Sequence, residues 1–208
     1  MKVCLDLHDF SVVNSRLDLL LKLKDHFPTF KVSLFTVPVD RADTWGIYTI
    51  RGEILNKIKE NLDWIQIIPH GYDHKRSEVR DCGYDQFRLL LKYIEESFEK
   101  DGLPFEKGFC APHWRWNEDV VRVLDEDGWW GAVDPRQPNM PTTKIFYRYS
   151  YTIDNIPLIT LNYRRLKLHG HIYGTKNDLG RCMDNLLKFP SDTEWCFVTE
   201  FLEENNEN

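Results

Sequence analysis

Two histidines four positions apart, His70 and His74, form the clearest candidate for chemistry in the chain. They follow a strand-like run that ends at Pro69. An i, i+4 spacing places two imidazoles on one side of a helical turn, close enough to share a metal ion. Such a pair also arises by chance in a histidine-rich chain, where it would only decorate an exposed turn. Pro69 and Gly71, beside a strand end, indicate a constrained loop instead of the middle of a surface helix.

Asp9 is the natural third ligand, because it lies just after the first predicted strand, residues 3–7. Two imidazoles and one carboxylate leave open positions on a metal, as hydrolytic sites require. The same donor set forms the facial triad of non-haem Fe(II) oxygenases, so an oxygenase is a second interpretation. Asp9 could instead cap the helix that follows it.

The remaining histidines cluster in the same way along the chain. Of the seven histidines, only His26 is expected on the surface. The other six lie at or just past the end of a predicted strand: His8, His70, His74, His113, His169 and His171. In parallel α/β architectures the strand ends converge on one rim, where ligands bind. His169 and His171 share one side of a strand, because side chains alternate with period two. They are either a hydrogen-bonded core pair or proton-transfer groups.

Asp134 and a set of tryptophans complete the candidate residues. Asp134 follows the predicted strand 130–133 and could orient a rim histidine or cap a turn. The tryptophans could form a flat platform for a sugar ring or belong to the core: Trp114, Trp116, Trp129 and Trp130.

Strand-like and helix-like segments alternate along most of the chain. Period-two and buried runs predict strands at 3–7, 31–36, 64–68, 108–111, 130–133, 145–151, 158–162, 166–172 and 195–201. Helical periodicity predicts helices at 13–25, 51–61, 84–100, 118–127 after an Asn117 cap, and 178–189. This alternation indicates an α/β fold with parallel strands and outer helices, as an open sheet or a barrel. No glycine-rich dinucleotide or phosphate loop is present.

Length and composition bound the remaining possibilities. The 208 residues are predicted to form one domain over 1–202, with a frayed acidic tail at 203–208. A net charge of −6 argues against a nucleic-acid partner. Five widely spaced cysteines, no signal-peptide pattern and no long apolar stretch predict free thiols, no membrane partner and a cytoplasmic protein. The oligomeric state stays open.

Together these segments resemble the polysaccharide deacetylase (NodB-homology) family, whose domain is a distorted (β/α) barrel of about seven strands. The family's T-F-D-D-G motif is similar to Leu7-His8-Asp9-Phe10-Ser11, in the I-H-D-V-S form of divergent members. Its H-S-x-x-H motif matches residues 70–74, and its R-x-P motif corresponds to residues 110–114. Its late L-x-H motif looks like Leu168-His169-Gly170-His171. The resemblance covers essentially the whole chain.

The resemblance implies hydrolysis of an N- or O-acetyl group on a carbohydrate, assisted by a divalent metal, with Zn²⁺ the expected ion. It implies Asp9, His70 and His74 as metal ligands, and His169 or His171 as the general acid. His113 and the nearby tryptophans Trp114 and Trp116 would shape the sugar pocket.

Two departures from the family leave the general base open. The family's base aspartate is His8 here, and the arginine that would pair with it is Cys110. An arginine placed to balance a carboxylate would face an imidazole instead, so the two changes are physically coherent. His8, Asp73, Asp134 or Asp6 could serve as the base. Alternatively, the chain is an inactive carbohydrate-binding barrel that lost catalysis with those two residues.

Overall fold

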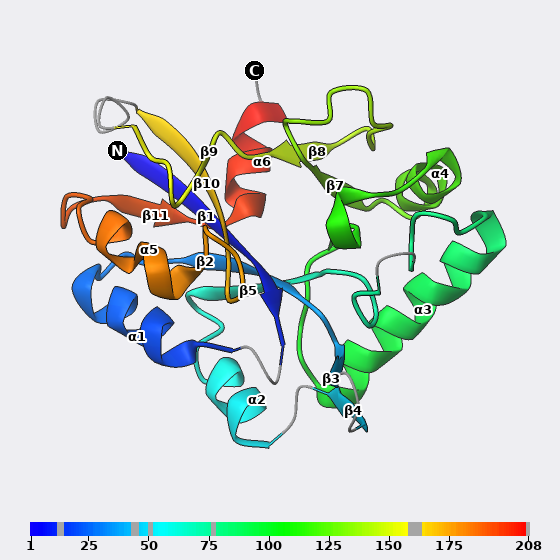
Figure 1. Cartoon of the computed structure of the whole chain (residues 1–208), viewed down its shortest axis with the longest axis horizontal. Coiled ribbons are helices and arrows are strands. Elements are labelled where there is room, and N and C mark those ends of the chain that lie inside the picture. The colour runs from blue at the N-terminus through cyan, green and yellow to red at the C-terminus, as the bar shows by residue number, and fades with distance from the viewer. Residues whose placement is uncertain (12–14, 43–45, 50–51, 76–77, 158–163, 207–208) are drawn as a thin grey trace.

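Parallel strands form two sheets that curve around a shared interior (Figure 1). The computed structural model describes residues 1–11, 15–42, 46–49, 52–75, 78–157 and 164–206. The larger sheet runs in the order β5 (Ile65–Pro69), β2 (Val32–Thr36), β1 (Lys2–Phe10), β10 (Arg165–His171), β9 (Tyr151–Thr152), with β11 (Glu194–Cys196) on the first residues of β1. The smaller sheet runs β6 (Gly108–Phe109), β7 (Trp130–Val133), β8 (Phe146–Arg148).

The two sheets meet at both edges, which makes a distorted barrel. Beside β5, the backbone N–H of Glu106 donates to Ile67 O (2.9 Å) and that of Cys110 to Pro69 O (3.2 Å). At the other edge β8 pairs with β7, and the chain then passes directly into β9, which pairs with β10. The expected α/β fold with a distorted (β/α) barrel is confirmed.

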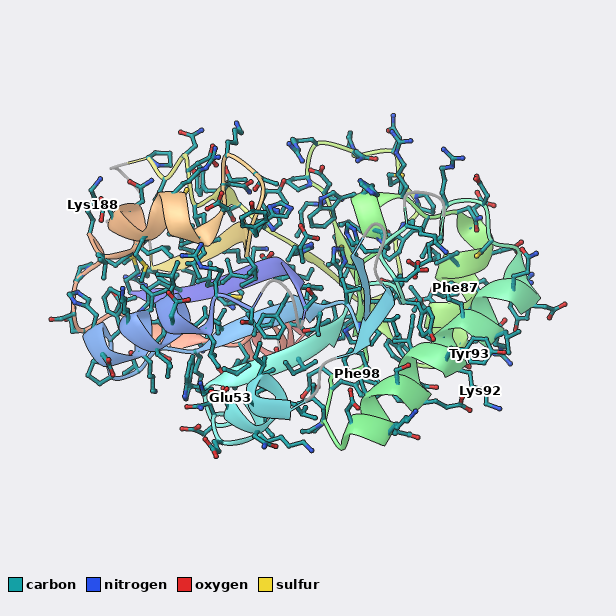
Figure 2. The ribbon with its side chains drawn as sticks, turned by 60° about the horizontal axis from the view of Figure 1, so that its bottom comes forward. Glu53, Phe87, Lys92, Tyr93, Phe98 and Lys188 are labelled. Atoms are coloured by element: carbon teal, nitrogen blue, oxygen red, sulfur yellow. The ribbon has the colours of Figure 1, made fainter. Side chains whose placement is uncertain are left out.

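The helices up to residue 186 cover the outside of the barrel with their apolar faces turned inward, whereas the C-terminal helix packs on the cluster inside the barrel. The helices are α1 (Leu17–His26), α2 (Gly52–Lys59), α3 (Tyr84–Asp101), α4 (Glu118–Glu126), α5 (Leu179–Leu186) and α6 (Val198–Asn206), with a 3₁₀ turn η1 (Pro112–Trp114). In α3, Phe87 and Phe98 turn inward while Lys92 and Tyr93 face outward (Figure 2). That pattern is the apolar stripe of an amphipathic helix.

Caps begin two of the helices where the sequence places them. Asn117 Oδ1 accepts the backbone N–H of Val120 (3.1 Å) at the start of α4, as expected. Asp178 Oδ1 accepts that of Arg181 (3.0 Å) at the start of α5. Each cap satisfies a backbone donor that the first turn leaves unpaired. The part of the chain that the structure describes holds no helix both long and apolar enough to cross a membrane.

The two faces of β1 lie in different layers. Val3, Leu5 and Leu7 pack outward in the apolar layer that includes α1 and α5, whereas Cys4 joins a second cluster inside the barrel. Alternation with period two therefore sends Asp6 and His8, which are on the same face as Cys4, into the interior. The five cysteines, all described, are free thiols as expected.

The C-terminal segment differs from its prediction. Residues 195–201 were expected to form one strand, but β11 ends at Cys196 and α6 begins at Val198. Glu200 Oε2 accepts the backbone N–H of Phe197 (3.0 Å), and this contact at the first turn favours a helix. The tail predicted to fray from residue 203 continues α6 as far as Asn206.

Two other segments need correction or cannot be compared. An antiparallel pair of strands, β3 (Val39–Ala42) and β4 (Gly46–Thr49), lies between the predicted strand 31–36 and the predicted helix 51–61, where periodicity predicts no strand. The predicted strand 145–151 is divided into β8 and β9, because its two halves pair with different sheets. The predicted strand 158–162 lies outside the described residues.

Candidate functional site

The register of two neighbouring strands gathers the polar side chains inside the barrel. β1 and β10 are parallel, with Asp6 opposite His169 and His8 opposite His171. Because all four positions have the same parity in their strands, the four side chains share one face. The strand periodicity in the sequence therefore predicts this grouping once the two strands are known to be neighbours.

Asp9 reaches the site through an irregularity in β1. In a regular strand His8 and Asp9 would point to opposite faces. The pairing of β1 with β2 shifts register between Leu7 and Phe10, and Asp9 has a left-handed backbone with φ 61°. This distortion places the Asp9 carboxylate beside the histidines that follow β5 instead of on the outer face of the sheet.

Asp9, His70 and His74 come together closely enough to hold one metal ion. Asp9 Oδ1 lies 3.3 Å from His70 Nε2 and 3.1 Å from His74 Nε2, and the three candidate ligand atoms are within 4.8 Å of one another. His70 Nδ1 lies 2.9 Å from Cys110 O and donates to it, which leaves Nε2 as the nitrogen that can bind metal. The donor set, with the His70 ring oriented by the Cys110 carbonyl, therefore fits a divalent cation.

The local electrostatics favour an ionised carboxylate and a neutral imidazole. Burial works to raise the pKa of Asp9, but hydrogen bonds and charge interactions with His70 and His74 lower it well below its usual range. Burial lowers the pKa of His70. Those are the protonation states a metal requires of these ligands. The side chains of Asp9 and His74 are 28% and 30% exposed, so the site opens to solvent on their side.

His171 faces the same three residues from β10. Its Nε2 lies 3.9 Å from Asp9 Oδ2, and its Nδ1 lies 3.2 Å from Asn177 Oδ1. Since an amide oxygen only accepts, Nδ1 carries the proton and Nε2 is directed at the cluster. Thr175 Oγ1 also donates to Asn177 Oδ1 (2.7 Å) and fixes that amide. Burial lowers the pKa of His171 to about 4.

This low pKa makes the metal-free protein less stable in acid. Between pH 6.5 and 4 the unfolded chain takes up the His171 proton while the native protein does not, so the free energy of unfolding falls as the pH falls. The expected loss from this residue is about 3 kcal/mol. Urea unfolding in the presence of a chelator, at several pH values, should show a smaller decrease in His171→Gln than in the wild type. Equal slopes in both proteins would contradict the prediction.

A buried carboxylate, Asp6, lies at the centre of the barrel. His169 Nδ1 lies 2.6 Å from Asp6 Oδ1, the Tyr147 hydroxyl donates to Oδ2 (2.9 Å), and His8 Nε2 lies 3.3 Å from Oδ1. Burial works to raise the pKa of Asp6, but the two histidines lower it well below its usual range. Asp6 is therefore an ionised group that accepts hydrogen bonds from His169 and Tyr147, with the His8 imidazole beside it. The His169, Tyr147 and His8 rings are themselves packed inside the barrel.

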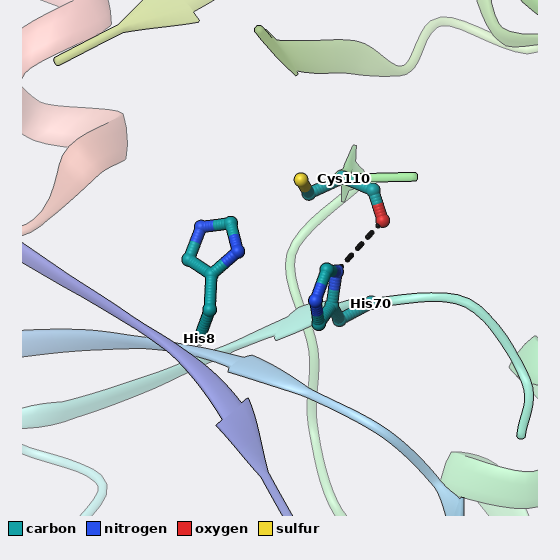
Figure 3. Close-up of side chains that lie close together, drawn as sticks. All are labelled: His8, His70 and Cys110. Atoms are coloured by element: carbon teal, nitrogen blue, oxygen red, sulfur yellow. Dashed lines mark hydrogen bonds between the residues drawn. The ribbon is translucent and has the colours of Figure 1, made fainter. Parts of the chain in front are cut away.

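His8 lies between this carboxylate and the metal-ligand candidates. Its ring stacks between Phe35 (centroids 4.4 Å apart) and Trp114 (4.7 Å), with the His70 ring edge-on at 4.7 Å. Figure 3 shows His8 and His70 side by side, with the Cys110 carbonyl joined to the His70 ring by a hydrogen bond. Burial lowers the pKa of His8 well below its usual range, so the imidazole is neutral at pH 7. A neutral imidazole is able to accept a proton.

Asp134 has other partners. Arg136 binds both carboxylate oxygens, with Nη2 2.7 Å from Oδ2 and Nε 2.9 Å from Oδ1, and the Tyr149 hydroxyl donates to Oδ1 (3.1 Å). The Tyr149 ring stacks on His169, with centroids 4.5 Å apart. Asp134 Oδ1 also accepts the backbone N–H of Arg136 (2.9 Å), so the expected turn cap is present. The hydrogen bonds of Asp134 reach the site through the Tyr149 hydroxyl, and its catalytic role stays a prediction.

The expected sugar-binding residues separate into two groups. His113 is exposed and its ring lies 5.2 Å from that of His74, while Trp114 is partly exposed and stacks on His8. Trp116 is buried, and its indole N–H donates to Pro141 O (2.8 Å), so it belongs to the core. Trp129 and Trp130 are also buried in the core, and His26 is on the surface as expected.

Several residues of the site were not identified from the sequence. Tyr147 and Tyr149 lie on alternate positions of a strand-like run, which is a signal for a shared face but not for an acidic partner. Asn177 and Glu78 lie in irregular segments, where no periodicity indicates the direction of a side chain.

Comparisons with known proteins agree with this architecture. No protein-family model and no curated protein sequence matches the chain. Among solved structures, a family 4 acetyl xylan esterase from Clostridium thermocellum, in complex with a cobalt ion, is 14% identical, with a TM-score of 0.64 over 99% of this chain and 92% of that one. The chitin deacetylase of the fungus Colletotrichum lindemuthianum is 17% identical, with a TM-score of 0.64 over 100% and 89% of the two chains.

A third similar structure is a CE4 family pseudoenzyme from Bacillus anthracis. It is 15% identical, with a TM-score of 0.55 over 98% of this chain and 66% of that one. The expected resemblance to polysaccharide deacetylases is thus confirmed for the fold. At these identities the likeness carries the fold and leaves the activity to the residues of the site.

Proposed function

We propose that this protein is a metal-dependent hydrolase that removes an acetyl group from a carbohydrate or a related substrate. The observation that carries the proposal is the convergence of Asp9, His70 and His74, whose candidate ligand atoms lie within 4.8 Å of one another. A fold shared with esterases and deacetylases of carbohydrates supports the substrate class. The parallel, helix-covered barrel speaks against the oxygenase interpretation, whose sites usually lie in jelly rolls.

Asp9, His70 and His74 would hold the divalent cation, with Zn²⁺ the expected ion. When bound there, the cation supplies a Lewis acid that polarises the acetyl carbonyl and lowers the pKa of water. The Nδ1–H contact of His70 with Cys110 O orients its ring for this role. The open side at Asp9 and His74 leaves room for the acetyl group.

His8 is the best candidate for the general base. It occupies the position of the family's base, its burial keeps it neutral, and Asp6 lies 3.3 Å from its Nε2. A proton on Nε2, facing the carboxylate, leaves Nδ1 to accept the proton from water. The Asp6 carboxylate then stabilises the imidazolium that forms, as a buried carboxylate does for a catalytic histidine. His8 and Asp6 would together replace the family's single aspartate.

His171 is the best candidate for the general acid. Its Nε2 is directed at Asp9, whereas His169 Nδ1 is bound to Asp6 in the interior and its ring is enclosed by Tyr149 and Trp114. To protonate the leaving nitrogen or oxygen of the sugar, His171 would first take up a second proton on Nε2, because its pKa of about 4 leaves that nitrogen unprotonated at pH 7. His169 would hold Asp6 in place, and His113 and Trp114 would border the sugar.

One experiment tests the proposal as a whole. The protein is purified without added metal and analysed for its metal content. Acetate release is then measured on acetylated xylo- and chito-oligosaccharides, before and after chelation. We expect about one divalent ion per chain, acetate release that chelation abolishes, and recovery on addition of Zn²⁺ or Co²⁺. A protein that binds no metal and releases no acetate would refute the proposal.

A carbohydrate-binding barrel without catalysis is the second candidate. The observation in its favour is that His8 and Cys110 stand where the family has its base and the arginine beside it. It predicts oligosaccharide binding, measured by calorimetry, that survives chelation and is accompanied by no acetate.

A further inference from the structure

The loop that carries His70 and His74 has an unusual backbone. Gly71 has φ 71° and His74 has φ 56°, both in the left-handed region. His74 is not glycine, so this conformation persists only if surrounding contacts impose it. Both imidazoles reach Asp9 Oδ1 from this loop, at 3.3 and 3.1 Å. Whatever imposes the loop conformation therefore also sets the spacing of the two imidazoles.

One carboxylate holds the backbone between the two histidines. Glu78 Oε1 accepts the N–H of Tyr72, and Glu78 Oε2 accepts the N–H groups of Asp73 (3.1 Å) and Lys75 (3.1 Å). Three donors that converge on one carboxylate make an anion-binding concavity of the kind called a nest. Two of the donors lie between His70 and His74, and the third lies immediately after His74.

Gly71 allows this carboxylate to approach the loop. A Cβ atom at position 71 would lie 2.9 Å from Glu78 Oε1 and 2.6 Å from Pro112 Cγ. Any side chain there would push the loop away from Glu78 and from η1. The loop is thus confined between a carboxylate that binds its N–H groups and a proline ring that packs on its glycine.

The surroundings of Glu78 are unfavourable for a charge, which argues that it has a specific task. The carboxylate is partly buried, and Asp73 lies beside it, paired with Lys75 through a 2.9 Å contact to Nζ. Burial and the Asp73 charge raise the pKa of Glu78 to about 7. An exposed glutamate would stabilise a surface turn without that penalty.

We propose that Glu78 is a positioning residue of the metal site, which sets the spacing of His70 and His74 through the backbone N–H groups of Tyr72, Asp73 and Lys75. The inference rests on the proposed metal site. The inference goes beyond the proposed metal site, because it assigns the geometry of that site to a residue that touches neither the metal nor the substrate.

Glu78→Gln tests the assignment with a side chain of equal size. One of its two acceptor oxygens becomes an NH₂ group, which would face backbone donors and release part of the loop. We expect 10–100-fold weaker Zn²⁺ binding, measured by competition with a chromophoric chelator, as for other residues that orient metal ligands. Glu126→Gln is the matched control, because Glu126 accepts from Tyr84 and Arg88 on the exposed surface of α3 and α4. It should bind Zn²⁺ as the wild type does.

Gly71→Ala separates loop geometry from charge, since it keeps the carboxylate and displaces the loop. It should weaken Zn²⁺ binding in the same direction as Glu78→Gln. A second readout, amide hydrogen exchange of Tyr72, Asp73 and Lys75 in the metal-free protein, does not depend on metal. We expect protected amides in the wild type and faster exchange in Glu78→Gln.

The outcomes distinguish this inference from the proposed function. Unchanged Zn²⁺ affinity in Glu78→Gln, beside a wild type that binds Zn²⁺, would overturn the role of Glu78 and leave the proposed function intact. A wild type that binds no metal would refute the proposed function. Unchanged amide exchange would then overturn the role of Glu78 as well.

Discussion

His74→Ala is expected to abolish metal binding and to lower acetate release by about 10³-fold or more. The variant loses one of the three candidate ligands, His74 Nε2, which lies 3.1 Å from Asp9 Oδ1. Without the metal it also loses the Lewis acid, which contributes several kcal/mol to transition-state stabilisation. Metal content by elemental analysis and acetate release at saturating substrate measure the two effects. The fold should remain cooperative, because the chain has an extensive apolar core that does not depend on metal.

The matched control for this substitution is His26→Ala. His26 is an exposed histidine at the end of α1. The variant should keep the metal content and the activity of the wild type. His70→Ala should behave as His74→Ala does. Unchanged metal stoichiometry in either of these two variants would exclude that residue as a ligand.

His171→Gln is expected to keep the metal and to lower kcat by about 10²–10⁴-fold on an acetylated amino sugar. An amine leaves poorly unless it is protonated, and His171 Nε2 is the imidazole nitrogen directed at Asp9 from β10. The measurement compares this substrate with the acetate ester of a nitrophenol, whose leaving group needs no proton. The loss should be much smaller on the ester.

Equal losses on the two substrates would contradict the acid role and make His171 a residue that positions substrate or metal. Asn177→Leu is the companion variant, because it removes the acceptor that keeps the proton on His171 Nδ1. It should show part of the His171→Gln loss on the amino sugar and little on the ester. A general loss of stability would lower activity on both substrates alike, and would not produce this difference between the amino sugar and the ester.

The sequence predicts most of the layers of the fold, because they depend on periodicity. Alternation in β1 separates Leu5 and Leu7, in the outer layer, from Asp6 and His8, in the interior. The helix α3 follows from its apolar stripe, and α4 from its Asn117 cap. The segment after Cys196 was assigned wrongly, because a short apolar run does not distinguish a strand from a helix.

The sequence predicts which residues form the candidate site better than it predicts their arrangement. The convergence of Asp9, His70 and His74 agrees with the expected grouping, although a regular strand would have turned Asp9 away from the histidines. For Asp134 the sequence offers a turn cap, which agrees with the contact from the Arg136 N–H, but no pattern indicates that the Arg136 side chain binds the same carboxylate. Pairings of this kind depend on the course of loops.

The choice among the four candidate bases also depended on tertiary structure. Asp73 pairs with Lys75, Asp134 with Arg136, and Asp6 is enclosed by His169 and Tyr147. His8 is left as the neutral group with a nitrogen available. Cys110 contributes its carbonyl oxygen to His70, a role that any residue at that position would fill through its backbone.

Left-handed backbone at residues other than glycine is concentrated in one place. Among the described residues five have it, and four of them border the candidate site: Asp9, His74, His113 and Trp114, the fifth being Arg16. Each such position costs about 1 kcal/mol or more. Such strain persists where surrounding contacts impose it, which is common at both binding and catalytic sites. Four strained positions around one group of side chains indicate that this part of the chain is shaped for a ligand or a reaction and not for stability alone.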